Sequence, residues 1–415
     1  MKPVQRSVPR ASAVQDPPCY APPMRATRLR RWGWLAALLV ACGRGDDAPD
    51  LAAADLVAAG APVNAPEHAR WTADASRAAE APGDAGTLAV SGGSPPIPPH
   101  TCPGEDVLPA LRARLVLEVF RAPTLPDAPP DAVEVGVSAA AFDAWTELAR
   151  ADELLFAMDY GTSSTALLLH PAAPRGELVV YHLGHGQGFG AALPILRDLL
   201  GRGLHVVVLA MPLTGPNPEL PEATVEGAPV PLRGHDSFAA LEAAGHPVMH
   251  LFVEPVHRAI RHALAVTDVA TVHMVGLSGG GWTTVLAAAL DPRIRTSVPI
   301  AGALPLDLRE EARGDLGDFE QLGERPLYRL AGYRELYLLA SGPGRAQLQI
   351  FNERDECCFS VEGREDALRA MERELRTALG GDPACGDFRV HVVRDQVEHA
   401  VTEEALELVA AALAR

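Results

Sequence analysis

Short apolar runs alternate with amphipathic segments through the second half of the chain, and this alternation limits the folds that are open to it. Continuous apolar runs predict buried strands at 177–184, 204–212, 269–277, 295–303, 346–352 and 388–394. Apolar residues at helical spacing predict helices at 189–203, 253–266, 282–291, 364–379 and 403–414. Strands that alternate with helices form a mostly parallel sheet with helices on both faces. The pattern therefore predicts an α/β fold.

The segment before this alternation predicts a different beginning. We expect a strand at 113–120 and a short helix at 140–151, followed within 154–172 by a hairpin that turns at Gly161. The central sheet is therefore predicted to be mixed, with an antiparallel leading hairpin. Two longer inserts, near 212–248 and 304–342, interrupt the 101–415 domain after the carboxyl ends of predicted strands. Ligand sites in open α/β sheets lie at such ends.

The first hundred residues predict an export signal and a tether rather than a folded domain. Within 1–41, basic residues precede a short apolar run, Trp32–Ala41, in the layout of a secretory signal. The run ends in Leu39–Cys42, which resembles a bacterial lipobox, so Cys42 is predicted to be lipidated; an ordinary signal peptide is the alternative, and the start is Met1 or Met24. Residues 42–100, rich in Ala, Pro and Gly, predict a flexible tether. We expect a cell-envelope lipoprotein anchored to a membrane, at the outer membrane or in the periplasm.

Charge and cysteine content narrow the class of protein further. The formal net charge of −17 argues against nucleic acid as a partner. Four cysteines follow the targeting region, Cys102, Cys357, Cys358 and Cys385, and an even number in an exported chain permits disulfides. A bridge from Cys385 to Cys357 or Cys358 is one candidate pairing, and the sequence does not fix the connectivity.

A lone serine among glycines is the strongest chemical signal. Gly276–Gly280 reads GLSGG, which fits the pattern G-x-S-x-G, and it lies between a predicted strand and a predicted helix. In that setting a sharp turn lifts the Ser278 hydroxyl above the sheet, and the helix N-terminus directs N–H groups toward it. A dinucleotide-binding turn would need another glycine pattern, and a P-loop would need a lysine. We therefore predict that Ser278 is a nucleophile.

Residues 105–415 resemble the α/β-hydrolases, in which a nucleophile, an acid and a histidine follow one another along the chain. The resemblance implies that His399, after the last predicted strand, is the general base; His391 is the competitor, but it lies within the strand. It implies an acid in the turn after the preceding strand, where Asp355 fits best and Glu353 and Glu356 are alternatives.

The resemblance also implies an oxyanion hole. One donor is expected to be the backbone N–H of Gly279, directly after Ser278. The other should come from the glycine-rich loop after the strand at 177–184, where His185-Gly186 resembles the family's His-Gly, so Gly186 or Gln187 is the expected donor.

These residues together predict a serine hydrolase that cleaves a small-molecule or polysaccharide carboxylic ester through an acyl-enzyme, without a cofactor. The alternatives are a peptidase related to prolyl oligopeptidases and a non-catalytic binding lipoprotein on the same fold. His246 and His250 are four residues apart and could form a metal site with His235 and His257, but exposed or capping histidines are commoner, so no metal ligand is expected.

Overall fold

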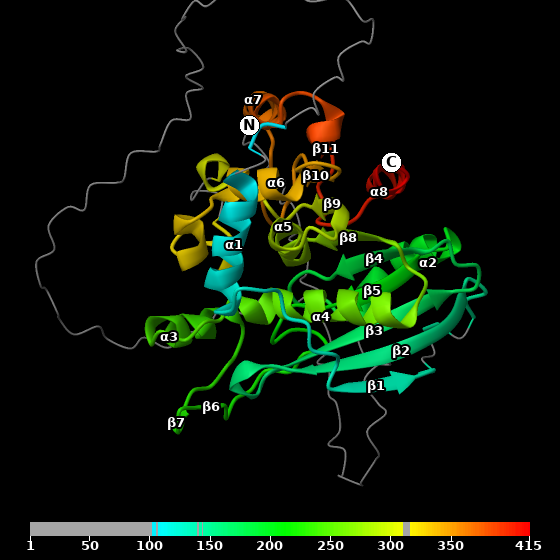
Figure 1. Cartoon of the computed structure of the whole chain (residues 1–415), viewed down its shortest axis with the longest axis vertical. Coiled ribbons are helices and arrows are strands. Elements are labelled where there is room, and N and C mark those ends of the chain that lie inside the picture. Colours follow the sequence, from blue (N-terminus) through cyan, green and yellow to red (C-terminus); the bar gives the residue numbers. More distant parts are fainter. Residues whose placement is uncertain (1–101, 105–106, 139–140, 143, 310–315) are drawn as a thin grey trace, which may run out of the picture. The chain divides into compact units, whose positions relative to one another are not determined.

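The computed structural model describes residues 102–104, 107–138, 141–142, 144–309 and 316–415 (Figure 1). These residues belong to one compact unit, 55–415. The predicted signal segment, the lipidated Cys42 and the tether lie outside the described residues. Within the described part, no helix is both long enough and apolar enough to cross a membrane.

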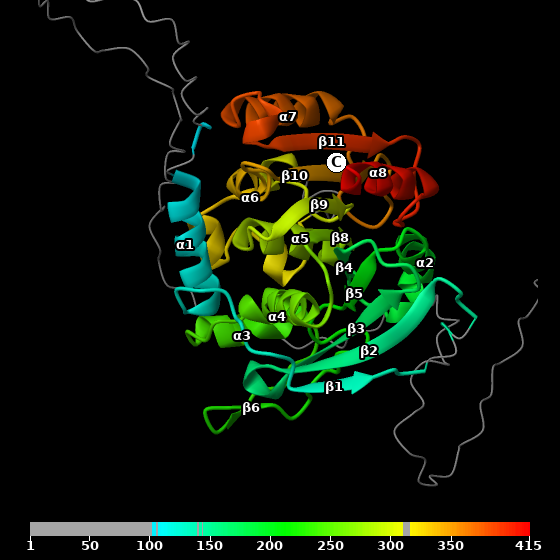
Figure 2. The same ribbon diagram turned by 45° about the vertical axis from the view of Figure 1, so that its right-hand side comes forward.

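The core of the unit is a sheet to which nine strands of the described residues contribute. Their spatial order is β1-β2-β3-β5-β4-β8-β9-β10-β11, and Figure 2 shows them fanning from β1 at the bottom to β11 at the top. The six strands from β5 to β11 in this order run parallel, whereas β1, β2 and β3 pair antiparallel. The strand bounds are Ala132–Val135 (β1), Leu148–Ala157 (β2), Ser163–Pro171 (β3), Glu177–His182 (β4), His205–Leu209 (β5), Thr271–Leu277 (β8), Ile294–Ile300 (β9), Ala346–Asn352 (β10) and Asp387–Val393 (β11).

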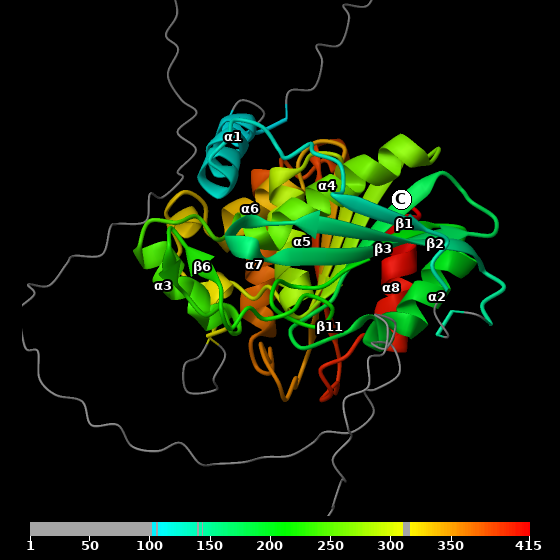
Figure 3. The same cartoon turned by 90° about the horizontal axis from the view of Figure 1, so that it is seen from below.

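Both faces of the central strands are buried, whereas the edge strand β1 is exposed, and this explains why the central strands are largely apolar. In β5, Val207 and Leu209 join one hydrophobic cluster, while Val206 and Val208 join the cluster on the opposite face. Helices α1 and α4 contribute to the first cluster, and α2 and α8 to the second. Figure 3 shows these two pairs of helices on opposite sides of the sheet. The helix bounds are Val107–Phe120 (α1), Leu193–Gly201 (α2), Phe238–Ala243 (α3), His250–Val266 (α4), Gly279–Leu290 (α5), Tyr333–Ala340 (α6), Glu365–Ala378 (α7) and Glu403–Leu413 (α8).

The predicted fold class is confirmed: α/β, with a mostly parallel central sheet, helices on both faces and an antiparallel leading hairpin. This is the arrangement that the resemblance to α/β-hydrolases implies. The hairpin turns at 158–162, where Gly161 has a φ of 76°. The two predicted inserts also follow carboxyl ends of strands, β5 and β9; the first carries the small hairpin β6 (Thr224–Val225) and β7 (Ala228–Pro229) and helix α3, and the second carries α6.

Two predictions near the start of the domain were wrong. Residues 113–120, predicted as a strand, belong to helix α1, in which Leu115 and Val119 are buried one helical turn apart. The valines of this segment are typical of a strand, but its apolar residues pack against the core at helical spacing, and this packing favours the helix. The predicted helix at 140–151 is instead a turn at Phe142 and Trp145 that leads into β2 from Leu148. There the long pairing with β3 overrides the helix propensity of the alanines.

The disulfides differ from the candidate pairing of Cys385 with Cys357 or Cys358. Cys385 pairs with Cys102, 283 residues away, rather than with Cys357 or Cys358, which pair with each other. The sequence could not reveal this pairing, because it depends on where the segment before α1 meets the loop before β11.

Candidate active site

The sequence-predicted residues converge because parallel strands end at one edge of the sheet. Ser278 directly follows β8, Asp355 follows β10 by three residues, and His399 follows β11 by six. Strands β8, β9, β10 and β11 are consecutive parallel neighbours, and Asn352 at the end of β10 is in register with Val393 at the end of β11. The sheet therefore brings residues that are far apart in the chain to its carboxyl edge, where such folds bind ligands.

Ser278 occupies a strained turn between β8 and α5. Its φ is 58° and its ψ is −126°, a left-handed conformation that a residue with a side chain rarely adopts. The backbone N–H of Ser278 donates to the Ile300 carbonyl at 2.9 Å, which ties the turn to the neighbouring strand. The sharp turn predicted from the sequence is thus present.

The flanking glycines are required by close contacts with backbone. A Cβ built on Gly276 would lie 2.2 Å from the Gly280 carbonyl oxygen, and one built on Gly280 would lie 2.1 Å from the His182 carbonyl oxygen. Larger side chains at either position would force α5 away from β4 and β8. The glycine spacing around Ser278 is therefore a packing requirement of this strand-to-helix turn.

The structure brings Asp355 and His399 together. The His399 Nδ1 atom lies 2.8 Å from the Asp355 Oδ2 atom, and the Asp355 side chain is completely buried. Burial alone would raise the pKa of Asp355, but the hydrogen bond and the charge of His399 hold it below its usual value. Asp355 is therefore an ionised partner that can orient the imidazole.

Three further groups hold the Asp355 carboxylate. The backbone N–H groups of Cys357 and Cys358 donate to its Oδ1 atom at 3.0 and 3.1 Å. The Asn352 amide donates to Oδ2 at 3.1 Å, and Asn352 itself ends strand β10. Asn352 is not among the residues predicted from the sequence, although an amide at the end of a predicted strand, three residues before the predicted acid Asp355, could have indicated this role.

The competing candidates lie elsewhere. The Glu353 carboxylate accepts hydrogen bonds from Arg394 and from the Asp395 amide, and Glu356 is exposed. His391 lies within β11, and its Nε2 atom is 2.6 Å from Glu404. None of the three has a hydrogen bond with Ser278, Asp355 or His399 among the described residues.

No hydrogen bond joins Ser278 to His399 in the described part of the chain. The His399 Nε2 atom is buried without a hydrogen-bond partner there. Ser278 and His399 both lie near His185. His399 is close enough to influence the pKa of His185, and the His185 ring lies against Gly279, the residue after Ser278. A buried, unpartnered ring nitrogen is free to interact with a nucleophile or a substrate.

The glycine-rich loop after β4 lies against Ser278. A Cβ built on Gly184 would lie 2.7 Å from the Ser278 Cβ atom. The Gln187 backbone N–H donates to the Gly184 carbonyl at 3.4 Å, and the Gln187 side-chain oxygen accepts from the Gly184 amide at 2.9 Å. Gly186 has a φ of 65°, which favours glycine. The loop thus approaches the serine closely.

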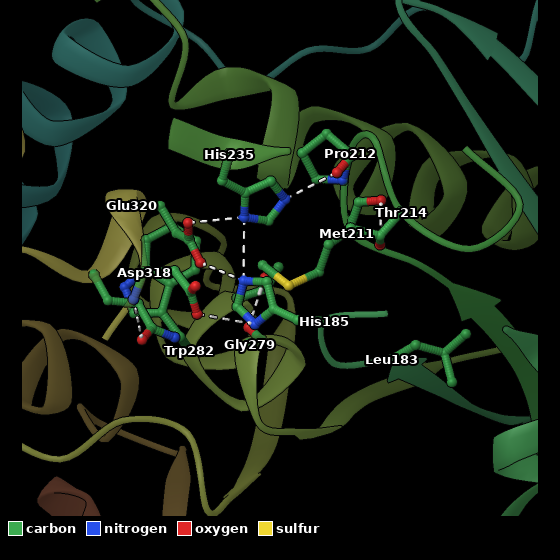
Figure 4. A network of polar contacts seen from close by, with 12 residues as sticks. Leu183, His185, Met211, Pro212, Thr214, His235, Gly279, Trp282, Asp318 and Glu320 are labelled. Atoms are coloured by element: carbon green, nitrogen blue, oxygen red, sulfur yellow. Dashed lines mark hydrogen bonds and ion pairs between the residues drawn. The ribbon is translucent and has the colours of Figure 1, made fainter. Parts of the chain in front are cut away.

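A second polar cluster, which we call the histidine–glutamate cluster, adjoins this loop and consists of His185, His235 and Glu320 (Figure 4). Its residues come from the β4 loop and from the two inserts. From the sequence, His185 is predicted only as part of the His185-Gly186 motif, and His235 only as one of four histidines that could form a metal site. Of those, His257 instead pairs with Asp291 in the core and His250 faces Asp159. Nothing local in the sequence singled out Glu320.

Comparisons with known proteins do not assign a family. No protein-family model matches the chain, and no curated protein matches it. Solved structures that are similar to it include acetyl xylan esterase 1 from Thermoanaerobacterium sp. JW/SL YS485, at 18% identity and a TM-score of 0.48, covering 75% of this chain and 93% of that one. Methylesterase BT1017 has 16% identity and a TM-score of 0.49, covering 74% and 62%. An acetyl xylan esterase from Paenibacillus sp. R4 has 14% identity and a TM-score of 0.44, covering 74% and 91%. The activity of this chain has to be inferred from its own residues.

Proposed function

We propose that this chain is a serine hydrolase in which Ser278 is the nucleophile, His399 the general base and Asp355 the orienting acid. The observation that carries the proposal is the 2.8 Å contact between His399 Nδ1 and Asp355 Oδ2 at the sheet edge where Ser278 ends β8. A serine hydroxyl becomes a nucleophile when a base removes its proton, and the base works best when a carboxylate fixes its orientation.

The Asp355 contact also selects the tautomer of His399. Because Asp355 is ionised, the proton of a neutral His399 lies on Nδ1, and the lone pair lies on Nε2. That nitrogen is the one without a hydrogen-bond partner among the described residues. It is therefore available to accept the Ser278 proton when substrate binding tightens the site.

We propose that the N-terminus of α5 and the β4 loop form the oxyanion hole. The Gly279 N–H begins α5, where an N–H has no partner within the helix. From the loop we assign the second donor to Gly186 or Gln187; the Gln187 N–H makes only a long 3.4 Å hydrogen bond. Two such donors stabilise the negative oxygen that forms when the serine attacks.

The proposed reaction has two steps. The Ser278 oxygen attacks the acyl carbon while His399 takes its proton, and the tetrahedral intermediate expels the alcohol, which receives that proton. Water then attacks the acyl-enzyme, His399 takes a proton from the water, and Ser278 leaves as the free hydroxyl with the acid as product. No cofactor takes part in this sequence.

We propose a carboxylic ester as the substrate, either a small molecule or an acylated polysaccharide outside the cytoplasm. The support is the resemblance to α/β-hydrolases together with the predicted export signal and Cys42 lipobox. Peptide-bond cleavage is the competing activity, and a panel of p-nitrophenyl esters and aminoacyl amides separates the two. Hydrolysis of amides but not esters would reject the ester assignment.

A fluorophosphonate probe tests the nucleophile directly. The wild-type protein should be labelled, and Ser278→Ala should not. Ser164→Ala is the matched control, because Ser164 is another buried serine and its hydroxyl has no hydrogen-bond partner among the described residues. A folded wild-type protein that resists labelling, or labelling that survives in Ser278→Ala, would overturn the proposal.

A further inference from the structure

The histidine–glutamate cluster brings three potential metal ligands into mutual contact. His185 Nε2 lies 3.1 Å from His235 Nδ1 and 2.9 Å from Glu320 Oε1, and His235 Nδ1 lies 2.9 Å from Glu320 Oε2. Figure 4 shows the three side chains directed toward one another. Ligand atoms around a tetrahedral zinc ion are about 3.3 Å apart, given zinc–nitrogen distances of about 2.0–2.1 Å. The cluster therefore needs to expand by only a few tenths of an ångström to hold such an ion.

The outer ring nitrogens of both histidines have partners. His235 Nε2 donates to the Pro212 carbonyl at 2.8 Å, so a neutral His235 has its lone pair on Nδ1, inside the cluster. His185 Nδ1 lies 3.3 Å from Asp318 Oδ2, which places its proton on the outer side as well. Metal-binding histidines characteristically donate their other N–H to a carbonyl or carboxylate in this way.

No placement of protons on the two inner ring nitrogens, His185 Nε2 and His235 Nδ1, satisfies every polar contact in the cluster. Glu320 is completely buried, and each of its two carboxylate oxygens faces one of the inner ring nitrogens at 2.9 Å. If one inner ring nitrogen carries a proton, the other nitrogen faces the carboxylate with a lone pair. If both carry protons, the 3.1 Å contact between His185 and His235 joins two donors. A cation bound among the three groups removes both conflicts.

We propose that His185, His235 and Glu320 bind a divalent transition-metal ion, with Zn²⁺ as the favoured ion. Two imidazoles and one carboxylate suit zinc, whereas magnesium and calcium prefer oxygen ligands. The same donor set occurs in zinc sites that keep one position for water. His185 is 26% exposed, so an ion and a water can reach the cluster from solvent, while His235 and Glu320 stay buried.

The proposed ion would fix the geometry of the β4 loop. The His185 ring lies against Gly279, since a Cβ built on Gly279 would fall 2.5 Å from His185 Cε1. Coordination would tie this ring to His235 in the first insert and to Glu320 in the second. We therefore assign the metal a positioning role beside Gly279. The binding itself does not depend on the proposed hydrolase activity.

Metal binding to the full-length protein tests the proposal. After removal of metals with dipicolinate, the wild-type protein should take up one equivalent of Zn²⁺, measured by mass spectrometry of the metal and by competition with a chromophoric chelator. Zn²⁺ should raise the melting temperature by a few degrees, and Co²⁺ should give the visible bands of a four-coordinate site. Glu320→Gln and His235→Gln should weaken Zn²⁺ binding by more than about 100-fold, beyond the 10–100-fold cost of losing an outer partner.

Two further variants keep the result interpretable. His170→Gln is the matched control, because His170 is a buried histidine that contacts a carboxylate, Asp152, at 2.9 Å outside the cluster; it should bind Zn²⁺ like the wild type. Asp318→Asn removes the charge of the outer partner of His185 but keeps a side-chain oxygen to cap the turn Phe319–Gln321, so it should weaken binding by about 10–100-fold. The proposal is overturned if the folded wild-type protein binds no Zn²⁺, or if Glu320→Gln and His235→Gln bind it normally.

A second group of side chains that could hold a metal ion, Cys357, Cys358 and His399, provides another check. Its two sulfur atoms are joined in a disulfide, which makes them poor ligands in the oxidised protein. If His399→Asn removes the metal while Glu320→Gln retains it, the ion belongs to that group and the proposal is wrong.

Discussion

Gly184 lies directly against Ser278: a Cβ built on Gly184 would fall 2.7 Å from the Ser278 Cβ atom and 2.9 Å from the Leu277 carbonyl oxygen. Contacts this short force something to shift, and the strained Ser278 turn, tied to Ile300, has little freedom to do so. The β4 loop and the turn at Ser278 therefore fit together only when residue 184 has no side chain.

The first prediction follows from this contact. Gly184→Ala should displace the loop from Ser278 and lower kcat/KM by about 100-fold, the cost of a misplacement on the scale of an ångström. Gly188→Ala is the control, because a Cβ built on Gly188 meets nothing within 4 Å, and it should leave kcat/KM within about threefold. Ester hydrolysis by the two variants, with circular dichroism to verify folding, checks this. Equal activities would contradict the role of the contact.

The second prediction concerns the acid. Asp355→Asn should keep the fold but lose the fixed tautomer of His399, so kcat should fall by about 10³–10⁴-fold. Glu356→Gln, an exposed carboxylate one residue away, should retain activity. Rate measurements across pH 5–9 should show the loss of activity in Asp355→Asn throughout this range. If Glu356→Gln loses the activity instead, the acid has been misassigned.

The third prediction is a pH dependence of stability. Burial would raise the pKa of Asp291, but hydrogen bonds from His257 and Arg293 hold it well below its usual value. Such a group stabilises the fold fully above its unfolded pKa of about 3.9, and this stabilisation is lost as the pH falls through its folded pKa. Asp291→Asn should therefore lower the free energy of unfolding by about 3 kcal/mol at pH 7, and the difference should shrink below about pH 4.

Urea denaturation at pH 7, 5 and 3.5 measures this difference. Asp127→Asn is the control, because the Asp127 side chain is 81% exposed and should contribute little at any pH. A destabilisation by Asp291→Asn that stays constant from pH 7 to pH 3.5 would show that the ionised carboxylate is not its source.

The fourth prediction contrasts the two disulfides. Cys102–Cys385 closes a loop across 283 residues, whereas Cys357–Cys358 joins neighbours. Replacing Cys102 and Cys385 by alanine should cost about 2–5 kcal/mol of stability, since a bridge over a long loop restricts the unfolded chain. Replacing Cys357 and Cys358 by alanine should cost much less stability. It should lower kcat, because without the bridge the backbone at 357 and 358 is free to turn its N–H groups away from Asp355. Thermal melts and initial rates distinguish the two effects.

The fifth prediction concerns the proposed anchor. The wild-type protein expressed in a bacterium with lipoprotein processing should partition into the detergent phase of Triton X-114, and Cys42→Ser should partition into the aqueous phase. Mass spectrometry of the wild-type N-terminus should find a diacylglycerol-modified Cys42. An unmodified N-terminus generated by cleavage at another site would favour an ordinary signal peptide.

The sequence was sufficient for most of the sheet because strands such as β5 contain a continuous apolar run, Val206–Leu209, and follow a clear helical segment. It failed at α1 and at the start of β2, where partners distant in sequence override local propensity. The convergence of Ser278, Asp355 and His399 was predictable because parallel strands share an edge. Glu320 was not predictable, because its importance arises only when the second insert folds back to meet His185 and His235.

The histidine–glutamate cluster is built from three separate segments of the chain, and this limits how the protein can be engineered and how its sequence can diverge. His185 belongs to the loop after β4, while His235 and Glu320 belong to separate inserts. Exchanging one insert with that of another enzyme would leave a buried carboxylate or an imidazole without its counterparts. The two inserts therefore have to be transplanted as a pair, and natural variation in one should be accompanied by matched variation in the other.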